Sequence, residues 1–308
     1  MSIKGKLLYN LYFKPKGKIA KINKQGGLSN TLKISRSRNE MISASKLLQY
    51  ECLNNSPLQV HFLTGIKYWY QTAFCAYSLG KQTEEGIQFV FHDDGTFNEK
   101  LIHQIKEQFP NSIIHSIEEI NETLNEHLPK SKYPLLNEKR KTYPHIKKLT
   151  DVHCGSAGWK LMLDSDMLFF KYPNEVIKWL NNPQEPFFLV DTINSYHYSF
   201  RIMQELTKKT IFEKLNVGII GLKSDEIDWE QLEYWIKVLE EKEGISYYLE
   251  QALSAMLVAG MQITIASEND YVVLPNKTEI FNPNATLHHY VAESKEWYFK
   301  EAWKKVIK

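Results

Sequence analysis

Two aspartates in the middle of an apolar run are the residues whose types and spacing point most directly to chemistry. The run is "LMLDSDMLFF" at residues 161–170, with Asp164 and Asp166 at its centre. Side chains two residues apart on an extended chain point to the same side, so both carboxylates can face one point while Ser165 faces away. Because a buried run does not tolerate unpaired carboxylates, they need a partner. Two hard oxygen ligands suit Mn²⁺ or Mg²⁺, and hence a diphosphate; alternatively, one aspartate caps a helix and the other pairs with a lysine.

Strands and helices are predicted to alternate on both sides of this pair. Strands are expected at residues 58–65, 86–95, 159–170 and 185–192, and helices at 68–80, 96–110 and 144–154. This alternation indicates an α/β fold with a mostly parallel central sheet flanked by helices. Ligands bind outside the carboxyl ends of the strands in such sheets. We therefore expect one rim to hold the residues at the predicted strand ends, which are Thr64, Gly65, Asp93, Asp94, Asp164, Asp166 and Asp191.

The composition is that of a globular protein with a substantial core. Of the 308 residues, 43% are hydrophobic and 13% aromatic, which excludes a disordered chain. Cys52, Cys75 and Cys154 are odd in number and lack metal-ligand spacing, which indicates a reducing compartment rather than a disulfide framework. No apolar stretch reaches about 18 residues, and the first residues lack the apolar core of a signal peptide. The sequence therefore predicts a cytoplasmic protein.

Charge is distributed unevenly along the chain. Residues 1–55 contain 11 Lys and Arg but only 2 Asp and Glu, although the net charge of the whole chain is +2. We therefore divide the chain into a basic N-terminal extension at 1–55 and an α/β domain at 56–308. The extension is either a solvated segment or one that contacts an anionic membrane surface or acceptor. Nucleic acid is not expected as a partner, since the basic residues lack a recognition motif.

The C-terminal tail is part of the predicted domain. Residues 294–308, "SKEWYFKEAWKKVIK", have an amphipathic pattern with a basic last turn that carries Trp303. We interpret the tail as a helix that docks on the domain. Contact with a membrane interface is the alternative, and would place a cytoplasmic protein peripherally on the membrane.

Several segments resemble the glycosyltransferases of the GT-A fold, and more narrowly those of family 8 and its relatives. "LMLDSDMLFF" is similar to their Asp-X-Asp segment, and "FLTGIKYWYQTAFCAYSL" to their first strand and helix, including the tyrosine at Tyr68. "FLVDT" is similar to the strand that ends near the donor sugar, here at Asp191. "LNVGIIGL" resembles an Asn-X-Gly stretch through Asn216 and Gly218.

Two segments nearer the C-terminus extend the resemblance. "LEQALSAML" at 249–257 resembles an Asp-Gln-Asp segment and places Gln251 on the glutamine beside the reacting sugar. "HYVAESKEW" at 289–297 resembles a His-X-X-Gly-X-X-Lys-Pro-Trp pattern through His289, Lys295 and Trp297. An imidazole is a good Mn²⁺ ligand, and an ammonium stabilises charge on a departing phosphate oxygen.

The resemblance implies a metal-dependent glycosyltransferase with the GT-A fold. It implies transfer of a sugar, with retention, from a nucleotide-diphosphate sugar such as a UDP-sugar to a glycan or lipid-linked acceptor. The implied ligands of Mn²⁺ or Mg²⁺ are Asp164, Asp166 and His289. The implied donor-site residues are Thr64, Gly65, Tyr68, Asp93, Asp94, Ser165, Asn216, Gly218 and Lys295, the last of these on the diphosphate. Those implied at the reacting sugar are Gln251 and Asp191, with Glu250 as the base if the enzyme inverts.

The sequence departs from the family pattern at three places. The first-strand turn offers Gly65, Ile66 and Lys67 where the family has an acidic residue that reads uracil and ribose. Ala252 replaces an aspartate, and Ala292 replaces the motif glycine. Asp93 is interpreted either as part of a donor-site acidic pair or as a cap of the following turn. These departures keep two alternatives open, a catalytically weak nucleotide-sugar or glycan-binding scaffold and a nucleotide-sugar hydrolase.

Overall fold

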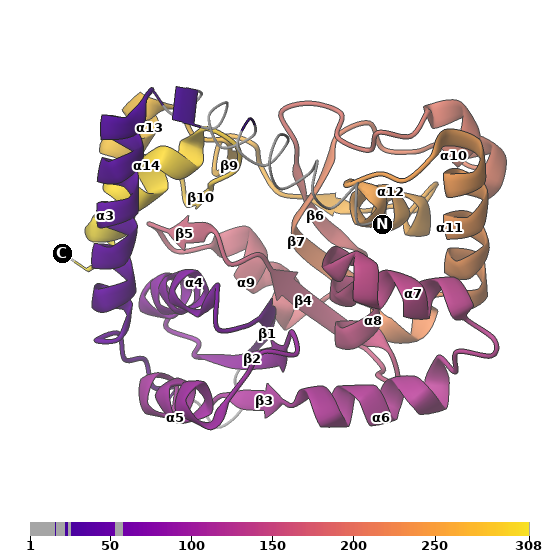
Figure 1. Ribbon diagram of the computed structural model, residues 1–308, viewed down its shortest axis with the longest axis horizontal. Helices are drawn as coiled ribbons and strands as arrows, with labels where there is room; N and C mark the ends of the chain where they lie inside the picture. Colours follow the sequence, from indigo (N-terminus) through magenta and orange to yellow (C-terminus); the bar gives the residue numbers. More distant parts are fainter. Residues whose placement is uncertain (1–15, 17–21, 24–25, 53–57, 308) are drawn as a thin grey trace.

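A seven-stranded sheet forms the centre of the molecule. The computed structural model describes residues 16, 22–23, 26–52 and 58–307. In sheet order the strands are β3 (Ile113–His115), β2 (Ile87–Asp93), β1 (Leu58–Thr64), β4 (Trp159–Leu163), β7 (Leu215–Lys223), β6 (Phe187–Val190) and β8 (Thr264–Ile265) (Figure 1). Among these seven strands only β7 is reversed, because it pairs antiparallel with both β4 and β6. The predicted mostly parallel sheet is confirmed.

Each face of the sheet has its own apolar core. Side chains alternate along β4, so that Leu161 and Leu163 join one core and Met162 joins the other. The helices of the first core are α3 (Leu28–Ser45), α4 (Trp69–Lys81), α5 (Glu99–Gln108), α9 (Asn174–Asn181), α13 (Lys277–Phe281) and α14 (Ser294–Lys300). Those of the second are α6 (Ile117–His127), α7 (Pro134–Thr142), α8 (Lys147–His153), α10 (Phe200–Thr207), α11 (Trp229–Glu243) and α12 (Leu249–Leu257).

The apolar run at 159–170 is two strands rather than the single strand expected from the sequence. The chain leaves β4 at Asp164 and resumes after Asp166 as β5, which belongs to a different sheet. This second sheet has the order β5-β10-β9 and consists of β5 (Met167–Phe169), β10 (Leu287–His289) and β9 (Tyr271–Val273). The periodicity could not reveal the break, because both halves of the run are buried.

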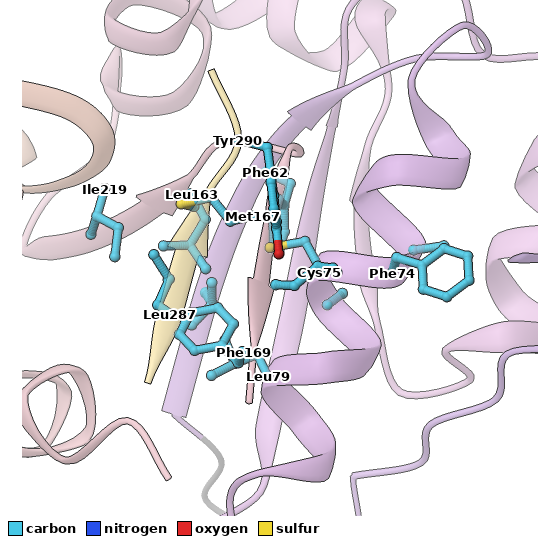
Figure 2. Packing of buried hydrophobic residues seen from close by; sticks show 14 of the residues in the cluster. Phe62, Phe74, Cys75, Leu79, Leu163, Met167, Phe169, Ile219, Leu287 and Tyr290 are labelled. Atoms are coloured by element: carbon cyan, nitrogen blue, oxygen red, sulfur yellow. The ribbon is translucent and has the colours of Figure 1, made fainter. Parts of the chain in front are cut away.

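The small sheet packs on α4. Figure 2 shows Met167 and Phe169 of β5 close to Cys75 and Leu79 of α4. The hydroxyl of Ser78 in α4 also accepts a hydrogen bond from the amide of Phe169 (3.0 Å). This contact fixes β5 against the helix and therefore fixes the end of the aspartate turn.

The C-terminal tail docks on the domain, as the sequence predicts. It forms α14 and then a 3-10 helix at Ala302–Lys305. The buried ring of Trp303 packs edge to face on Phe74, with 5.4 Å between ring centroids. The last residue, Lys308, lies outside the described residues.

Part of the basic N-terminal segment packs into the domain. Helix α3 lies against α4 and α14 (Figure 1), with Ile34 and Met41 buried in the first core. The guanidinium carbon of Arg38 lies 4.4 Å from the ring centroid of Phe299. Most of residues 1–25 lie outside the described residues, and the boundary at residue 55 stays a prediction. Among the described helices, none combines the length and the apolar character needed to cross a membrane.

Candidate active site

The turn at Asp164–Asp166 is held by backbone hydrogen bonds to both sheets. The amide of Asp164 donates to the carbonyl of Gly218 in β7 (2.8 Å). The carbonyl of Asp166 accepts from the amide of Tyr290, which follows β10 (2.9 Å). Both aspartate side chains line cavities at the carboxyl end of β4. Two carboxylates are therefore tolerated between apolar strands because they lie in a cavity wall and not in a core.

The structure brings together the three predicted metal ligands. One ligand atom each of Asp164, Asp166 and His289 lies within 4.8 Å of the others. The Nε2 atom of His289 is 3.4 Å from Oδ1 of Asp166 and 3.9 Å from Oδ2 of Asp164. Two carboxylates and an imidazole form a donor set that suits Mn²⁺ and is compatible with Mg²⁺. The residues present therefore fit a divalent cation.

The Asn-X-Gly stretch orients the imidazole of His289. Oδ1 of Asn216 accepts from the amide of Gly218 (2.9 Å) and lies 3.2 Å from Nδ1 of His289. Because an amide oxygen only accepts, we assign the proton to Nδ1, which leaves the Nε2 lone pair for a metal. A Cβ atom at position 218 would lie 2.4 Å from Cε1 of His289. Glycine is therefore needed for the close approach of the ring.

Asp191 and Gln251 are joined to the same network. Oδ2 of Asp191 accepts from Nδ2 of Asn216 (3.3 Å) and from Nε2 of Gln251 (3.0 Å). Nε2 of Gln251 also donates to the carbonyl of Leu215 (2.7 Å). Both amide hydrogens of Gln251 are thus used, while its oxygen has no hydrogen-bond partner among the described residues. This oxygen is available to a ligand in the cavity that Gln251 lines.

Each aspartate of the turn has an ammonium partner. Nζ of Lys295 lies 2.8 Å from Oδ2 of Asp166, and Nζ of Lys148 lies 2.7 Å from Oδ1 of Asp164. Burial alone would raise the pKa of Asp166, but His289 and Lys295 hold it well below its usual range. Burial alone would lower the pKa of Lys148, yet Asp164 and Glu250 raise it above the ordinary value. The site is therefore a network of paired charges that runs from the buried Lys148 to the exposed Lys295.

Glu250 is a buried carboxyl group at the first turn of α12. Its side chain is 5% exposed, and Oε2 lies 3.9 Å from Nζ of Lys148. Burial raises the pKa of Glu250 to about 7, against the opposing effect of Lys148. Oε1 has no hydrogen-bond partner among the described residues. A carboxyl group with a pKa near neutrality can accept or donate a proton at physiological pH.

Two adjoining cavities meet at the aspartate turn. The larger has a volume of about 580 Å³ and is lined by His289, Asp191, Gln251 and Glu250 among others. The smaller, of about 280 Å³, extends toward the end of β1. The residues that line both are His145, Lys148, Asp164, Asp166, Tyr247 and Lys295. The predicted metal ligands and Lys295 thus stand at or beside the junction of two spaces of small-molecule size.

The first-strand turn forms the far end of the smaller cavity. Thr64, Tyr68 and Asp94 line it together with Ser165. The carboxylate of Asp94 lies directly over Gly65, because a Cβ atom at position 65 would be 2.1 Å from its Oδ1. Asp94, which directly follows strand β2, therefore places a carboxylate over the first-strand turn, whose own residues include no acidic side chain.

Asp93 does not share this position. Its Oδ1 accepts hydrogen bonds from the amides of Gly95 (2.7 Å), Thr96 (2.9 Å) and Phe97 (3.0 Å). Its side chain is occupied by the turn that follows β2, and the residue is buried. We therefore assign Asp93 to capping and remove it from the predicted donor-site set.

Two departures from the family pattern have structural explanations. Ala252 is fully buried in the second core, so an acidic side chain there would face apolar residues rather than the cavity. Ala292 has a φ of +46°, a conformation that favours glycine. The backbone at position 292 thus keeps a glycine-like geometry although the side chain has changed.

Sequence reasoning missed Lys148 and His145. The segment at 144–154 was interpreted only as a helix, although its residues His145 and Lys148 line both cavities. The available signal was a lysine in a short helix whose neighbours Leu149 and Val152 are apolar and buried. His145 packs edge to face on Tyr247, with ring centroids 5.0 Å apart, and so positions that ring at the cavity junction.

Comparisons with known proteins identify the fold. Neither protein-family models nor curated proteins match this sequence. Among solved structures, mouse xyloside xylosyltransferase 1 (apo form) superposes with a TM-score of 0.52 at 11% identity, covering 80% of this chain and 99% of that one. The bifunctional glycosyltransferase WbbM gives 0.53 at 13% identity, covering 84% of this chain and 50% of that one. The galactosyltransferase LgtC, in complex with donor and acceptor sugar analogs, gives 0.50 at 13% identity, covering 76% and 87%. The chain therefore has the GT-A fold of these glycosyltransferases.

Proposed function

We propose that this protein is a metal-dependent glycosyltransferase that uses a nucleotide-diphosphate sugar. The observation that carries the proposal is the convergence of Asp164, Asp166 and His289 at the junction of two cavities. A bound Mn²⁺ or Mg²⁺ would withdraw charge from the donor diphosphate and so favour its departure. The fold is consistent with this chemistry, since the galactosyltransferase LgtC binds donor and acceptor sugar analogs on the same fold.

The ammonium groups of Lys148 and Lys295 would hold the diphosphate. Both lie at the junction of the cavities, and each already pairs with one aspartate of the turn. With the aspartate oxygens holding a cation, the ammonium groups of Lys148 and Lys295 would be free to bind the phosphate oxygens. Their positive charge would stabilise the negative charge that develops on the leaving diphosphate.

The nucleoside would occupy the end of the smaller cavity near β1. Tyr68 is 43% exposed and offers a ring for the base to stack on. The carboxylate of Asp94 accepts hydrogen bonds only, so it would select ribose hydroxyls or a base N–H. We therefore keep uridine as the first candidate base.

The sugar would lie in the larger cavity beside Asp191 and Gln251. In the transfer, the bond between the anomeric carbon and the diphosphate oxygen breaks, and an acceptor hydroxyl oxygen bonds to that carbon. The acceptor oxygen would bond on the face from which the diphosphate leaves, which gives the retained configuration, and the acceptor proton would pass to the departing diphosphate oxygen. The acceptor would be a glycan or a lipid-linked glycan, and Tyr247 and Tyr248 line the cavity where its sugar rings can pack.

The first test measures thermal unfolding with UDP, GDP, CMP and ADP, each with and without Mn²⁺. A ligand at about a hundred times its dissociation constant should add roughly 2.7 kcal/mol to the free energy of unfolding. We expect one nucleotide to stabilise the protein only when Mn²⁺ is present. Asp166→Asn should abolish this effect, since it removes a metal ligand.

Asp270→Asn is the matched control for that variant. Asp270 is exposed and lies in the turn before β9, outside the residues that line the two cavities. It should keep the full nucleotide effect. If no nucleotide stabilises the wild-type protein in Mn²⁺ or Mg²⁺, the aspartate turn is structural and the proposal fails. Release of free sugar without added acceptor, at the rate seen with acceptor, would instead identify a hydrolase.

A further inference from the structure

A third cavity lies on the other side of the first-strand turn. It has a volume of about 430 Å³ and lies between the end of α3, the turn after β1 and the start of α5. Each of these elements contributes one lysine to its wall, namely Lys46, Lys67 and Lys100. Positive charge from three separate segments therefore converges on one surface hollow.

No carboxylate among the described residues neutralises these three lysines. Within the part of the chain that the structure describes, none of them forms an ion pair, whereas the lysines of the candidate active site each have a carboxylate within 2.8 Å. Lys67 packs only on the ring of Tyr68, with Nζ 4.8 Å from the ring centroid. The hollow therefore fits an anionic partner.

An exposed apolar side chain lines the same hollow. Ile66, next to Lys67, is 50% exposed, and Leu47, which follows Lys46 in the sequence, is 83% exposed. Ile42 and Tyr70 line the interior. Lysines beside exposed aliphatic side chains are typical of surfaces that bind the headgroup and upper acyl region of a bilayer.

We propose that this hollow, with Ile66 in its wall, docks the protein on a bilayer that contains anionic lipids. The sequence adds charge of the same sign, because residues 1–24 contain seven lysines and no acidic residue. The turn that carries Lys67 continues directly into Tyr68, which lines the smaller cavity of the candidate active site. Docking would therefore bring the transferase rim next to the bilayer, where a lipid-linked acceptor is held.

The test is co-sedimentation of the full chain with vesicles, either of phosphatidylcholine alone or of phosphatidylcholine with phosphatidylglycerol. We expect binding only to the anionic vesicles, weakening as salt is raised. A triple variant, Lys46→Gln with Lys67→Gln and Lys100→Gln, should lower the vesicle partition coefficient by about a hundredfold, at several-fold per lysine. The matched control is Lys130→Gln with Lys178→Gln and Lys242→Gln, which removes the same charge from exposed positions elsewhere.

The control variant should bind like the wild-type protein apart from a small loss of long-range attraction. Equal losses in the two triple variants would overturn the proposal, because net charge alone would then explain the binding. Unchanged binding of the first variant, or equal binding to both vesicle types, would overturn it as well. Nucleotide stabilisation in Mn²⁺ is measured on the same samples, so that a failure of docking is distinguished from a failure of the proposed activity.

Discussion

Two clusters of titratable side chains lie at the central sheet; one combines opposite charges, and the other is neutral. The first is the candidate active site, in which carboxylates alternate with ammonium groups. The second is a histidine row, made of His61 in β1, His92 in β2 and His115 in β3. Nδ1 of His61 lies 3.1 Å from Nε2 of His92, and the rings of His92 and His115 stack with centroids 4.9 Å apart.

The groups that surround the histidine row add no negative charge within it. The ammonium group of Lys160 in β4 opposes protonation of the row, and Glu119 acts only on His115. Burial lowers the pKa of the three histidines and of His153 in α8, so the row stays neutral. None of them lines the two cavities of the candidate site. Burial of titratable groups is therefore not by itself the mark of a ligand-binding site, whereas opposite charges gathered at a cavity are such a mark.

The largest expected effect comes from removing the ammonium group at the centre of the first cluster. Lys148→Met leaves the buried carboxyl group of Glu250 and the partly buried carboxylate of Asp164 without their cation, and should lower the free energy of unfolding by roughly 3 kcal/mol. Lys160→Met is the matched variant, because Lys160 has no carboxylate partner among the described residues and burial lowers its pKa to about 8. Lys160→Met should lower the free energy of unfolding by about 1 kcal/mol, because it removes the hydrogen bond to the carbonyl of Val152. Urea unfolding at neutral pH measures the loss of stability in both variants. Equal losses would contradict the inference that paired charges distinguish the candidate active site from the histidine row.

The next effect concerns the backbone that supports the metal ligands. Gly218→Ala would push on the ring of His289, and should weaken Mn²⁺ affinity about 10- to 100-fold, as for other residues that orient a ligand. Ile220→Val, in the same strand but in the second core, should lower stability by about 1 kcal/mol without changing the affinity. Calorimetric titration of Mn²⁺ in the presence of UDP measures both. An unchanged affinity in Gly218→Ala would exclude His289 from the metal site.

His153, which lies beside the histidine row, predicts a loss of stability in acid. Burial lowers the pKa of His153 to about 3, whereas an unfolded histidine has a pKa of about 6.5. Between these values the unfolded chain binds more protons, so the free energy of unfolding falls as the pH drops below about 6.5. A histidine that stays neutral contributes about 2 kcal/mol to this loss between pH 7 and pH 5.

We therefore expect His153→Asn to lose about 2 kcal/mol less than the wild-type protein over that range. Glu250 acts in the opposite direction, because its pKa is raised on folding, but it does so equally in both proteins. His103→Asn, at an exposed position, should follow the wild-type curve. Urea unfolding at pH 5, 6 and 7 gives the slopes, and identical slopes for His153→Asn would show that His153 is not held neutral.

The smallest effect is a gain in stability near the candidate site. Leu274 and Ala292, two of the non-glycine residues with positive φ, line the larger cavity. Ala292→Gly should relieve backbone strain of about 1–2 kcal/mol, partly offset by the entropy of glycine at about 0.5–1 kcal/mol. Ala285→Gly, where φ is not positive, should only destabilise. If thermal unfolding ranked the two variants in the opposite order, the backbone at Ala292 would not be strained.

Local patterns in the sequence were enough to predict several helices and strands, whereas the candidate metal ligands followed from the family resemblance. Helix α4 was expected at 68–80 and found at Trp69–Lys81, because apolar periodicity and a glycine near its end are properties of the segment itself. Asp164, Asp166 and His289 were predicted together because the motif order of the GT-A family ties them. These predictions needed no knowledge of which surfaces pack together.

Tertiary structure decided the residues that act across elements. The partner of Asp164 is Lys148, which lies 16 positions earlier on a helix that looked purely structural. Asp94 reaches over Gly65 only because β2 pairs with β1 in parallel register, while Asp93 turns inward to cap its own loop. Residue types and spacing determine which groups can ionise or bind a metal. Which of them pair depends on the packing of segments distant in sequence, because a charge responds to whatever lies within a few ångströms of it, whichever strand or helix supplies it.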